Sequence, residues 1–229
     1  MTSGRFIHHL KVERPAATEG AAEARERLRE KFPRAALRRM THLGMLLGST
    51  LEGVALSASD AVVYASSYAE TRALEDFLAS FPAASPLLFQ TSIHPGGVQQ
   101  VMIGRQQPIA RLWPLAGRVR LVEQALLTAL MEPSPCVVLL GGEERGTWLL
   151  EQGMASDRAF AFGLVLTREP ARAIGRIEFT SDAGAGSNLK TGYTADEPCP
   201  SLAVWADALA EKAPLSWCGT GGEWRLAWD

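Results

Sequence analysis

The groups in this sequence that could carry covalent chemistry are three cysteine thiols, at Cys136, Cys199 and Cys218. A thiolate is the nucleophile of many acyl-transfer enzymes, and it needs a neighbouring base or a lowered pKa to react. The thiols are odd in number and widely spaced, so they indicate neither a disulfide framework nor a zinc site. Cys136 opens an apolar run, where a cysteine packs as a small hydrophobic residue. A cysteine-dependent thioesterase or acyltransferase therefore stays open as one interpretation.

Four histidines, His8, His9, His42 and His94, are the other candidate bases and metal ligands. His8 and His9 fall in a predicted strand, where neighbouring side chains point to opposite faces of a sheet. A metal ion shared by this pair is therefore not expected. We predict no metal site and no cofactor.

Three further motifs could suggest other chemistry. Residues 141–144 (GGEE) place two carboxylates side by side, but adjacent glutamates in a loop rarely converge on one atom. Ser66 and Ser67 follow a predicted strand without the Gly-x-Ser-x-Gly turn of a hydrolase. The glycine-rich stretches GAGS and GTGG do not lie between a strand and a helix with a following lysine, so a phosphate-binding loop is not indicated.

Composition narrows the class of protein. The 229 residues suit one domain of generous size, 47% of them are hydrophobic, and the formal net charge is −2. This charge gives no reason to expect nucleic acid as a partner. No apolar run approaches the roughly 20 residues of a membrane span, and the first residues lack the apolar middle of a secretory signal. We therefore expect a cytoplasmic protein.

Segments with strand character alternate with segments of helical character, which predicts an α/β domain with a mixed sheet. The C-terminal strand pair is expected to form a hairpin around glycines 219–222, and residues 181–200 are expected to form a long loop. The predicted strands are residues 5–12, 61–66, 108–113, 137–140, 159–167 and 174–180, with two more within 215–228. The predicted helices are residues 16–31, 37–54, 67–81, a short one from about 94, one from 117 to about 130, and 201–212.

Three of these helices carry apolar stripes at the spacing that one buried helix face requires. The first stripe is Met40, Leu43, Leu47 and Leu51; the second is Ala73, Leu74, Phe77, Leu78 and Phe81; the third is Val119, Val122, Ala125, Leu126, Ala129 and Leu130.

Residues 37–144 resemble the N-terminal half of a β-ketoacyl synthase of the thiolase-like fold. The resemblance is carried by ALRRMTHLGMLLGSTLEGVAL, DAVVYASSYAETRALEDFL, TSIHPGGVQQVMIGRQQPIA and the strand–turn–helix PIARLWPLAGRVRLVEQALLTAL before CVVLLGGEE. These segments, and the tail GEWRLAW, are similar to a short, chain-length-factor-like subgroup of aryl-polyene and polyketide-type pathways. The resemblance implies one ketosynthase-like N-terminal domain over residues 1–229. It also implies a thiolase-like half-fold, with a mixed, mostly buried sheet flanked by helices and a C-terminal strand hairpin.

The sequence differs from this family at the residues that carry out catalysis. When residues 137–144 are laid on the family's buried strand and Gly-Gly-acid ending, Leu115 falls where the family has its nucleophilic cysteine. The two histidines of the synthases come from a C-terminal half that we do not expect in this chain. Covalent catalysis needs a nucleophile together with groups that stabilise charge. We therefore predict a non-catalytic protein.

The resemblance implies the role of a chain length factor, the inactive partner in a heterodimer with an active β-ketoacyl synthase. In this family the strand before the nucleophile pairs across the two-fold axis of the dimer, which would place Ile109, Arg111 and Trp113 near the interface. Trp113 and Leu115 would line or plug the acyl tunnel. A large side chain there would limit the number of methylenes that fit, each worth roughly 0.8 kcal/mol of burial. Half of a thiolase-like fold should also leave an apolar face exposed.

Two further interpretations concern other partners. Arg34, Arg38 and Arg39 cluster near a predicted helix start and would suit an acidic acyl carrier protein, although a solvated helix face is the commoner reason for such a cluster. The chain could also be an acyl-carrier or lipid-binding module that has no synthase partner.

Overall fold

Eight strands form one mixed sheet in the computed structural model, which describes residues 2–181 and 199–229. The strands are β1 (Thr2–Glu13), β2 (Ala61–Ser66), β3 (Arg111–Ala116), β4 (Cys136–Glu143), β5 (Phe160–Thr167), β6 (Gly175–Ser181), β7 (Leu215–Gly219) and β8 (Gly222–Trp228). Their order across the sheet is β3-β2-β4-β5-β1-β6-β8-β7. β3, β2 and β4 are parallel, and every other neighbouring pair is antiparallel. The predicted mixed sheet and C-terminal hairpin are thus confirmed.

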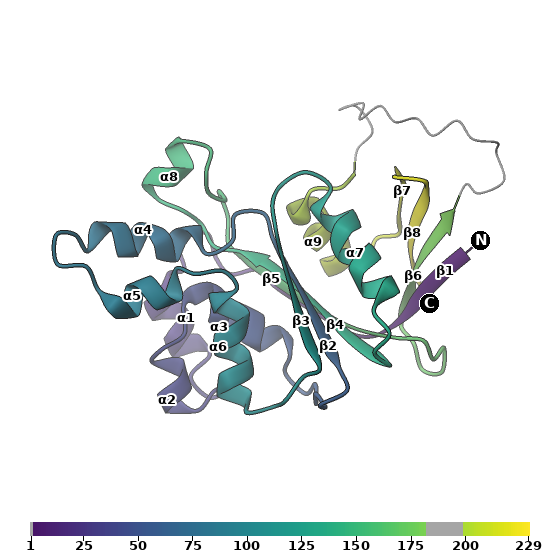
Figure 1. Cartoon of the computed structure of the whole chain (residues 1–229), viewed down its shortest axis with the longest axis horizontal. Helices are drawn as coiled ribbons and strands as arrows, with labels where there is room; N and C mark the ends of the chain where they lie inside the picture. The colour runs from purple at the N-terminus through teal and green to yellow at the C-terminus, as the bar shows by residue number, and fades with distance from the viewer. Residues whose placement is uncertain (1, 182–198) are drawn as a thin grey trace.

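Helices cover both faces of the sheet (Figure 1). They are α1 (Ala21–Arg27), α2 (Arg34–Leu37), α3 (His42–Thr50), α4 (Thr71–Ala79), α5 (Pro86–Thr91), α6 (Gly96–Arg105), α7 (Leu121–Met131), α8 (Trp148–Glu151) and α9 (Leu202–Ala210). α7 and α9 pack on one face, and α1, α3 and α6 pack on the other. Within the described residues, no helix has the length and apolar character that a membrane crossing requires.

The central strands are buried on both faces because their side chains alternate between two cores. In β2, Val63 points to the core beneath α7 and α9, whereas Val62 and Tyr64 point to the core beneath α3 and α6. Leu139 and Leu140 of β4 divide in the same way. This burial on both faces explains why residues 61–65 form a continuous apolar run rather than an alternating one.

Most predicted elements are present, but several boundaries moved. The predicted helix 37–54 is divided into α2 and α3, because Thr41 caps α3 by accepting a hydrogen bond from the amide of Gly44 at 3.0 Å. The stripe from Met40 to Leu51 is buried, as predicted. The predicted strand 108–113 is shifted to β3, three residues later. Most of the predicted loop 181–200 lies outside the described residues.

The stripe predicted on the helix 67–81 is not buried. In α4 and the turn after it, Ala73 is buried, but Leu78 is 41% exposed and Phe81 is 56% exposed. Val119 is likewise exposed, because it lies in the turn before α7 rather than within the helix. The helical spacing correctly indicated an apolar face. α5 covers part of that face through the contact of Phe89 with Phe77, and Leu78 and Phe81 stay exposed.

Candidate functional site

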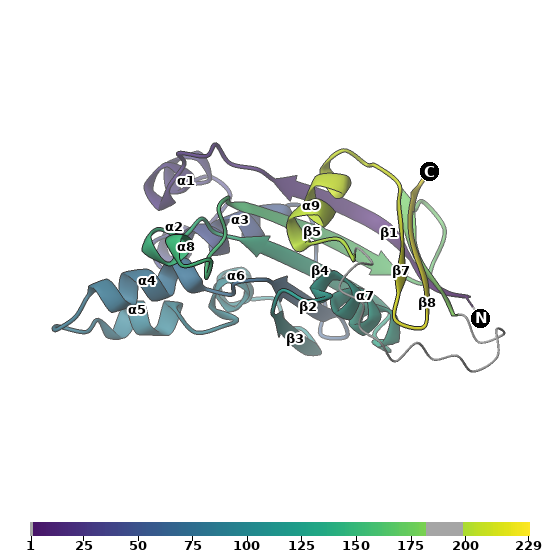
Figure 2. The same ribbon diagram turned by 90° about the horizontal axis from the view of Figure 1, so that it is seen from above.

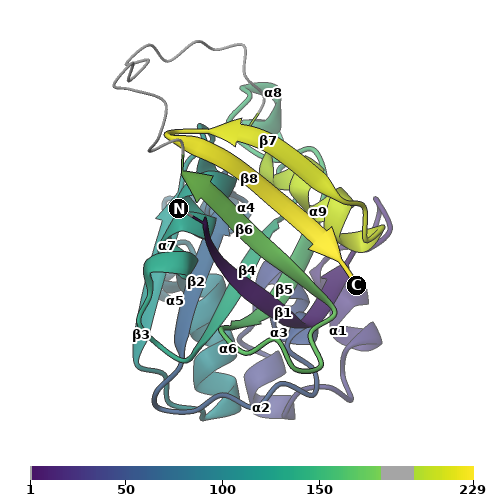
Figure 3. The same cartoon turned by 90° about the vertical axis from the view of Figure 1, so that its right-hand side faces the viewer.

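The candidate site is built around β3, the strand at one end of the sheet. β3 pairs with β2 on one side, and in the described part of the chain its other side has no strand neighbour. Leu115 packs against the core beneath α7, whereas Ile109, just before β3, packs against the core beneath α6. Pro114 donates no backbone hydrogen bond, which is typical of an edge strand. Figure 3 shows β3 at the margin of the molecule, with α7 beside it.

A buried carboxylate holds two side chains of this edge in place. Glu132, which follows α7, accepts hydrogen bonds from Arg111 Nη2 at 2.7 Å and from Trp113 Nε1 at 2.7 Å. The hydroxyl of Ser134 adds another at 2.9 Å. The ion pair with Arg111 lowers the pKa of Glu132 to about 2, and the other donors act in the same direction. The indole nitrogen of Trp113 is therefore held in place, while the residue as a whole remains 42% exposed.

The turn from β3 into α7 has the backbone geometry of a sharp bend but no nucleophile. Gly117 has φ +137° and Arg120 has φ +52°, both in the left-handed region. Arg120 Nε donates to Glu123 at 2.7 Å, and Glu123 accepts from the amide of Thr220 at 2.6 Å. Leu115 lies within β3, before the turn. Residues 115–120 read Leu-Ala-Gly-Arg-Val-Arg, so a nucleophile is missing whichever of these positions matches the family's cysteine.

The three thiols lie apart, on β4, before α9 and on β7. Burial raises the pKa of Cys136, at the start of β4, to about 11. Burial also raises the pKa of Cys199, whereas Cys218 is exposed on β7. The thiol of Cys199 donates a hydrogen bond to the carbonyl oxygen of Pro200, with 3.8 Å between sulfur and oxygen. A reactive thiolate needs a lowered pKa, so this geometry does not favour cysteine chemistry.

The histidines also lie in separate places. His8 and His9 bind the carbonyls of Glu169 and Thr50, each at 2.8 Å. His42 contacts Glu19, and burial lowers its pKa. Among the described residues, no group of three or more metal-binding side chains gathers.

Glu143 and Glu144, the acids of GGEE, bind different elements; Glu143 is buried and Glu144 is partly buried. Glu143 accepts hydrogen bonds from the amide of Ser67 at 2.5 Å and from the hydroxyl of Ser66 at 3.2 Å. Glu144 accepts from the amide of Leu43 in the first turn of α3 at 3.2 Å. Burial raises the pKa of each carboxyl to about 7. The two groups therefore hold backbone amides rather than converge on one atom.

Two more buried glutamates extend this arrangement: Glu70, which precedes α4, and Glu75 within α4. Glu70 accepts from the amide of Gly97, at the start of α6, at 3.0 Å and contacts His94 Nδ1 at 2.8 Å. Glu75 accepts from the amides of Thr147 and Leu149 at 2.8 Å, where α8 begins. Sequence reasoning missed these roles, because the amides that the carboxylates bind lie 27 to 74 residues away along the chain.

Exposed apolar side chains gather on the side of the molecule that carries β3. We define the edge patch as Trp113, Val119, Leu127 and Met131, from β3, the turn and α7. We define the hairpin patch as Leu74, Leu78, Phe81, Leu87, Phe89 and Ile93, from α4, α5 and the turns after them. Figures 2 and 3 both place α5, β3 and α7 along this side. Residues 77–93 contain no charged side chain.

The three arginines of the predicted carrier-protein site lie elsewhere. Arg34 is in α2, and Arg38 and Arg39 follow it; all three are exposed. They are close to one another along the chain but lie away from the β3 edge, since Figure 3 shows α2 at the bottom of the view and β3 at its left margin.

Comparison with known proteins identifies the fold family of this chain. No family model and no curated protein matches this chain. A solved ketosynthase in complex with its chain length factor from Xenorhabdus doucetiae contains a similar chain, with a TM-score of 0.64 and 15% identity over 97% of this chain and 98% of that one. The ishigamide ketosynthase/chain length factor is similar with a TM-score of 0.55 and 13% identity over 79% of this chain and 68% of that one. The chain therefore has the thiolase-like fold of the ketosynthase and chain length factor structures.

Proposed function

We propose that this chain is a non-catalytic, chain-length-factor-like partner of a β-ketoacyl synthase. The observation that carries the proposal is the β3 edge. It combines a strand edge with no neighbour among the described residues, a fixed aromatic ring and a turn without a nucleophile. Such an edge can bind another chain and has no group with which to attack a thioester.

The first argument concerns the strand edge itself. Proteins cover, shorten or charge their edge strands, because unpaired amide and carbonyl groups invite another strand. Here Arg111 is turned toward Glu132, so its charge is neutralised by the protein's own carboxylate. β3 is therefore available for pairing with a partner strand, as the family resemblance predicts.

The second argument concerns the apolar side chains that flank the edge. Trp113 and Met131 are 42% and 74% exposed, and α5, which carries part of the hairpin patch, lies along the same side of the molecule. Monomeric proteins rarely leave an apolar surface of this kind uncovered. Interface hot spots are rich in tryptophan held in place before binding, which describes Trp113 with its nitrogen bound to Glu132.

The third argument comes from the structural likeness. The Xenorhabdus doucetiae structure is described as a ketosynthase in complex with its chain length factor, and the matched chain is close to this one in length. This supports a ketosynthase as the partner. The type of pathway (fatty-acid, aryl-polyene or polyketide-like), the docking of a carrier protein and the cytoplasmic location remain predictions.

Within this role, Trp113 and Leu115 are proposed to limit the length of the acyl chain. They lie on the same side of β3, since alternate residues of a strand share a face. Leu115 is half-buried against the core beneath α7, and Trp113 is exposed beside it. A partner that covers this edge would bring its acyl tunnel against these two side chains, while Ile109 and Arg111 would lie at the start of the contact.

Co-purification tests the proposal. The chain is expressed with a tagged ketosynthase encoded beside it, and the Leu127→Asp and Met131→Asp variants are compared with Ser216→Asp, a control on the exposed face of the opposite edge strand β7. The proposal predicts that the wild type and the control co-purify in equal amounts with the synthase. The two variants of the edge patch should bind at least about tenfold more weakly. Equal recovery of all four proteins, or of none, would rule out the β3 edge as the binding face.

A further inference from the structure

The turn between β3 and α7 carries one arginine whose charge the chain does not neutralise. Residues 111–132 contain three arginines and two glutamates, and no lysine or aspartate. Arg111 pairs with Glu132 and Arg120 pairs with Glu123, each at 2.7 Å. Arg118 is exposed, and in the described part of the chain its guanidinium forms no ion pair. Residues 111–132 therefore carry a single positive charge that is not compensated.

The guanidinium of Arg118 is held against an aromatic ring. Its Cζ lies 5.5 Å from the centre of the Tyr68 ring, within the range of a cation–π contact. Tyr68 lies in the turn after β2, and Glu143 fixes this turn by accepting hydrogen bonds from the amides of Ser67 at 2.5 Å and of Tyr68 at 3.4 Å. A side chain that is ordered before binding loses less conformational entropy in a complex. Arg118 is therefore positioned before a partner arrives.

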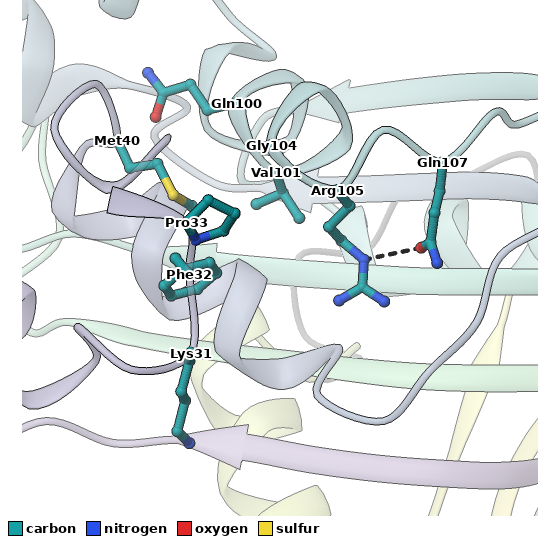
Figure 4. A pocket seen from close by; sticks show the side chains of 9 residues that line it. All are labelled: Lys31, Phe32, Pro33, Met40, Gln100, Val101, Gly104, Arg105 and Gln107. Atoms are coloured by element: carbon teal, nitrogen blue, oxygen red, sulfur yellow. Dashed lines mark hydrogen bonds between the residues drawn. The ribbon is translucent and has the colours of Figure 1, made fainter. Parts of the chain in front are cut away.

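Arg105 shows how this chain uses an arginine within its own structure. It lines a cavity of about 250 Å³ between residues 31–33 and α6 (Figure 4). Its guanidinium donates to the carbonyl of Leu51 at 3.1 Å and to the side chain of Gln107 at 2.9 Å. Among the described residues, Arg118 donates no hydrogen bond of either kind. Its N–H donors are available to another molecule.

A partner that covers the β3 edge would also cover Arg118. Its neighbour Val119 belongs to the edge patch and is 73% exposed. The amide of Gly117 donates to the carbonyl of Ser66 at 3.3 Å, which keeps the turn beside the end of β2. A guanidinium that is taken out of water without a counter-ion costs much more free energy than one that meets a carboxylate. The partner must therefore supply a negative group at this position.

We propose that the partner places a carboxylate side chain against Arg118, and that this ion pair helps the chain to distinguish its own ketosynthase from others. The inference rests on the proposed function, because it needs a partner at the β3 edge. Arginine binds a carboxylate through two parallel hydrogen bonds, so the pair sets the orientation of the partner as well as its charge. A synthase with a lysine or an apolar side chain at the facing position would leave Arg118 unpaired in the interface. Such a penalty against the wrong partner gives specificity.

A small anion is the other group that an arginine could bind. Phosphate sites usually combine several cations or backbone amides. The other two arginines of residues 111–132 are already paired with glutamates. A carboxylate, which one arginine can bind through both of its oxygens, therefore suits Arg118 better, and added phosphate tests the alternative.

Binding of the full chain to the β-ketoacyl synthase proposed as its partner tests the inference. The variants are Arg118→Met, which keeps the apolar stem and removes the charge, and Arg118→Glu, which reverses the charge. The matched controls are Arg225→Met and Arg225→Glu, at an exposed arginine of β8, near the other end of the sheet. The affinity is measured in phosphate-free buffer and again with added inorganic phosphate.

We expect the wild type and both Arg225 variants to bind the synthase equally, with or without phosphate. Arg118→Met should bind at least about tenfold more weakly, and Arg118→Glu more weakly still, because two carboxylates then face each other. If the wild type binds and both Arg118 variants bind as well as it does, this inference is wrong while the proposed function stands. If wild-type binding requires phosphate, Arg118 serves a free anion and the inference is also wrong. Absence of wild-type binding under every condition would overturn the proposed function and this inference together.

Zero-length cross-linking identifies the carboxylate directly. Arg118→Lys provides an amine at the same position, and a carbodiimide couples this amine to a carboxylate in contact with it, forming an amide bond as the reagent takes up water. Mass spectrometry of the digested complex should find the introduced lysine joined to an aspartate or glutamate of the synthase. Arg225→Lys should give no such link. A complex in which the Arg118→Lys variant also gives none would contradict the proposal.

Discussion

The indole nitrogen of Trp113 donates a hydrogen bond to the buried carboxylate of Glu132 at 2.7 Å, although the ring itself lies at an exposed sheet edge. The edge of the sheet is thereby tied to the end of α7. Arg111, two residues before Trp113 in β3, donates to the same carboxylate. An aromatic ring that faces solvent is thus held in a fixed place before any partner arrives.

The Trp113→Phe substitution removes this donor and keeps most of the ring. A hydrogen bond to a charged group contributes about 1.5–3 kcal/mol, so we expect the free energy of unfolding to fall by an amount in that range. Urea denaturation measures the change. Trp148→Phe, at another exposed tryptophan on α8, is the control and should cost less than about 0.5 kcal/mol. Equal effects of the two substitutions would show that the bond to Glu132 contributes nothing.

The buried acids Glu143 and Glu144 predict how stability depends on pH. Each has a pKa raised by burial from 4.5 to about 7, so the folded state holds protons that the unfolded state releases. The free energy of unfolding should therefore fall as the pH rises from about 4.5 to about 7. His42, whose pKa burial lowers from 6.5, acts in the opposite sense, because its protonation on acidification disfavours the fold.

Single variants separate these contributions. Glu143→Gln and Glu144→Gln should each reduce the loss of stability between about pH 5 and about pH 8, because the amide does not ionise. Glu223→Gln, on the exposed side of β8, should leave the loss unchanged. If both buried variants lose as much stability as the wild type over this range, the carboxyls do not titrate as their burial implies.

Glu75 is expected to hold the start of α8. Its carboxylate accepts hydrogen bonds from the amides of Thr147 and Leu149, and Glu75→Ala leaves these donors without their partner. We expect a loss of about 1–3 kcal/mol and faster amide exchange at the two positions. Hydrogen exchange with mass spectrometry detects the local change. Asp76→Ala, at the next and more exposed position, should not alter exchange there.

The thiols should differ in reactivity in the order of their exposure. Cys218 is exposed, whereas burial raises the pKa of Cys136 to about 11 and also raises that of Cys199. Alkylation at mildly alkaline pH should therefore modify Cys218 first. Peptide mass mapping over time gives the three rates. Faster modification of Cys136 or Cys199 than of Cys218 would revive the interpretation as a cysteine-dependent enzyme.

The order of the strands and of the longer helices could be predicted from local pattern, because that pattern depends on which faces are buried. The short helices α5 and α8 were not predicted. The run of residues 61–66 predicted β2 with its observed bounds. The shift of β3 was missed, because Pro114 has no amide proton and would be expected to end a strand. At an outer edge a proline is tolerated within the strand.

The candidate site could be predicted only in part. The absence of a nucleophile is visible in the sequence, and so is an apolar stripe on α4. Whether that stripe is covered depends on tertiary packing, and the structure leaves Leu78 and Phe81 exposed. The hydrogen bond from Trp113 to Glu132 could not be predicted from the sequence either, because Glu132 lies 19 residues further along the chain.

Native mass spectrometry of the chain mixed with the β-ketoacyl synthase proposed as its partner, after incubation with an acyl-pantetheine thioester, tests the central claim most directly. The account predicts a one-to-one complex in which the acyl group is attached to the ketosynthase and none is attached to this chain. An acyl adduct on this chain, at Cys136, Cys199 or Cys218, or the absence of any complex between the two proteins, would contradict it.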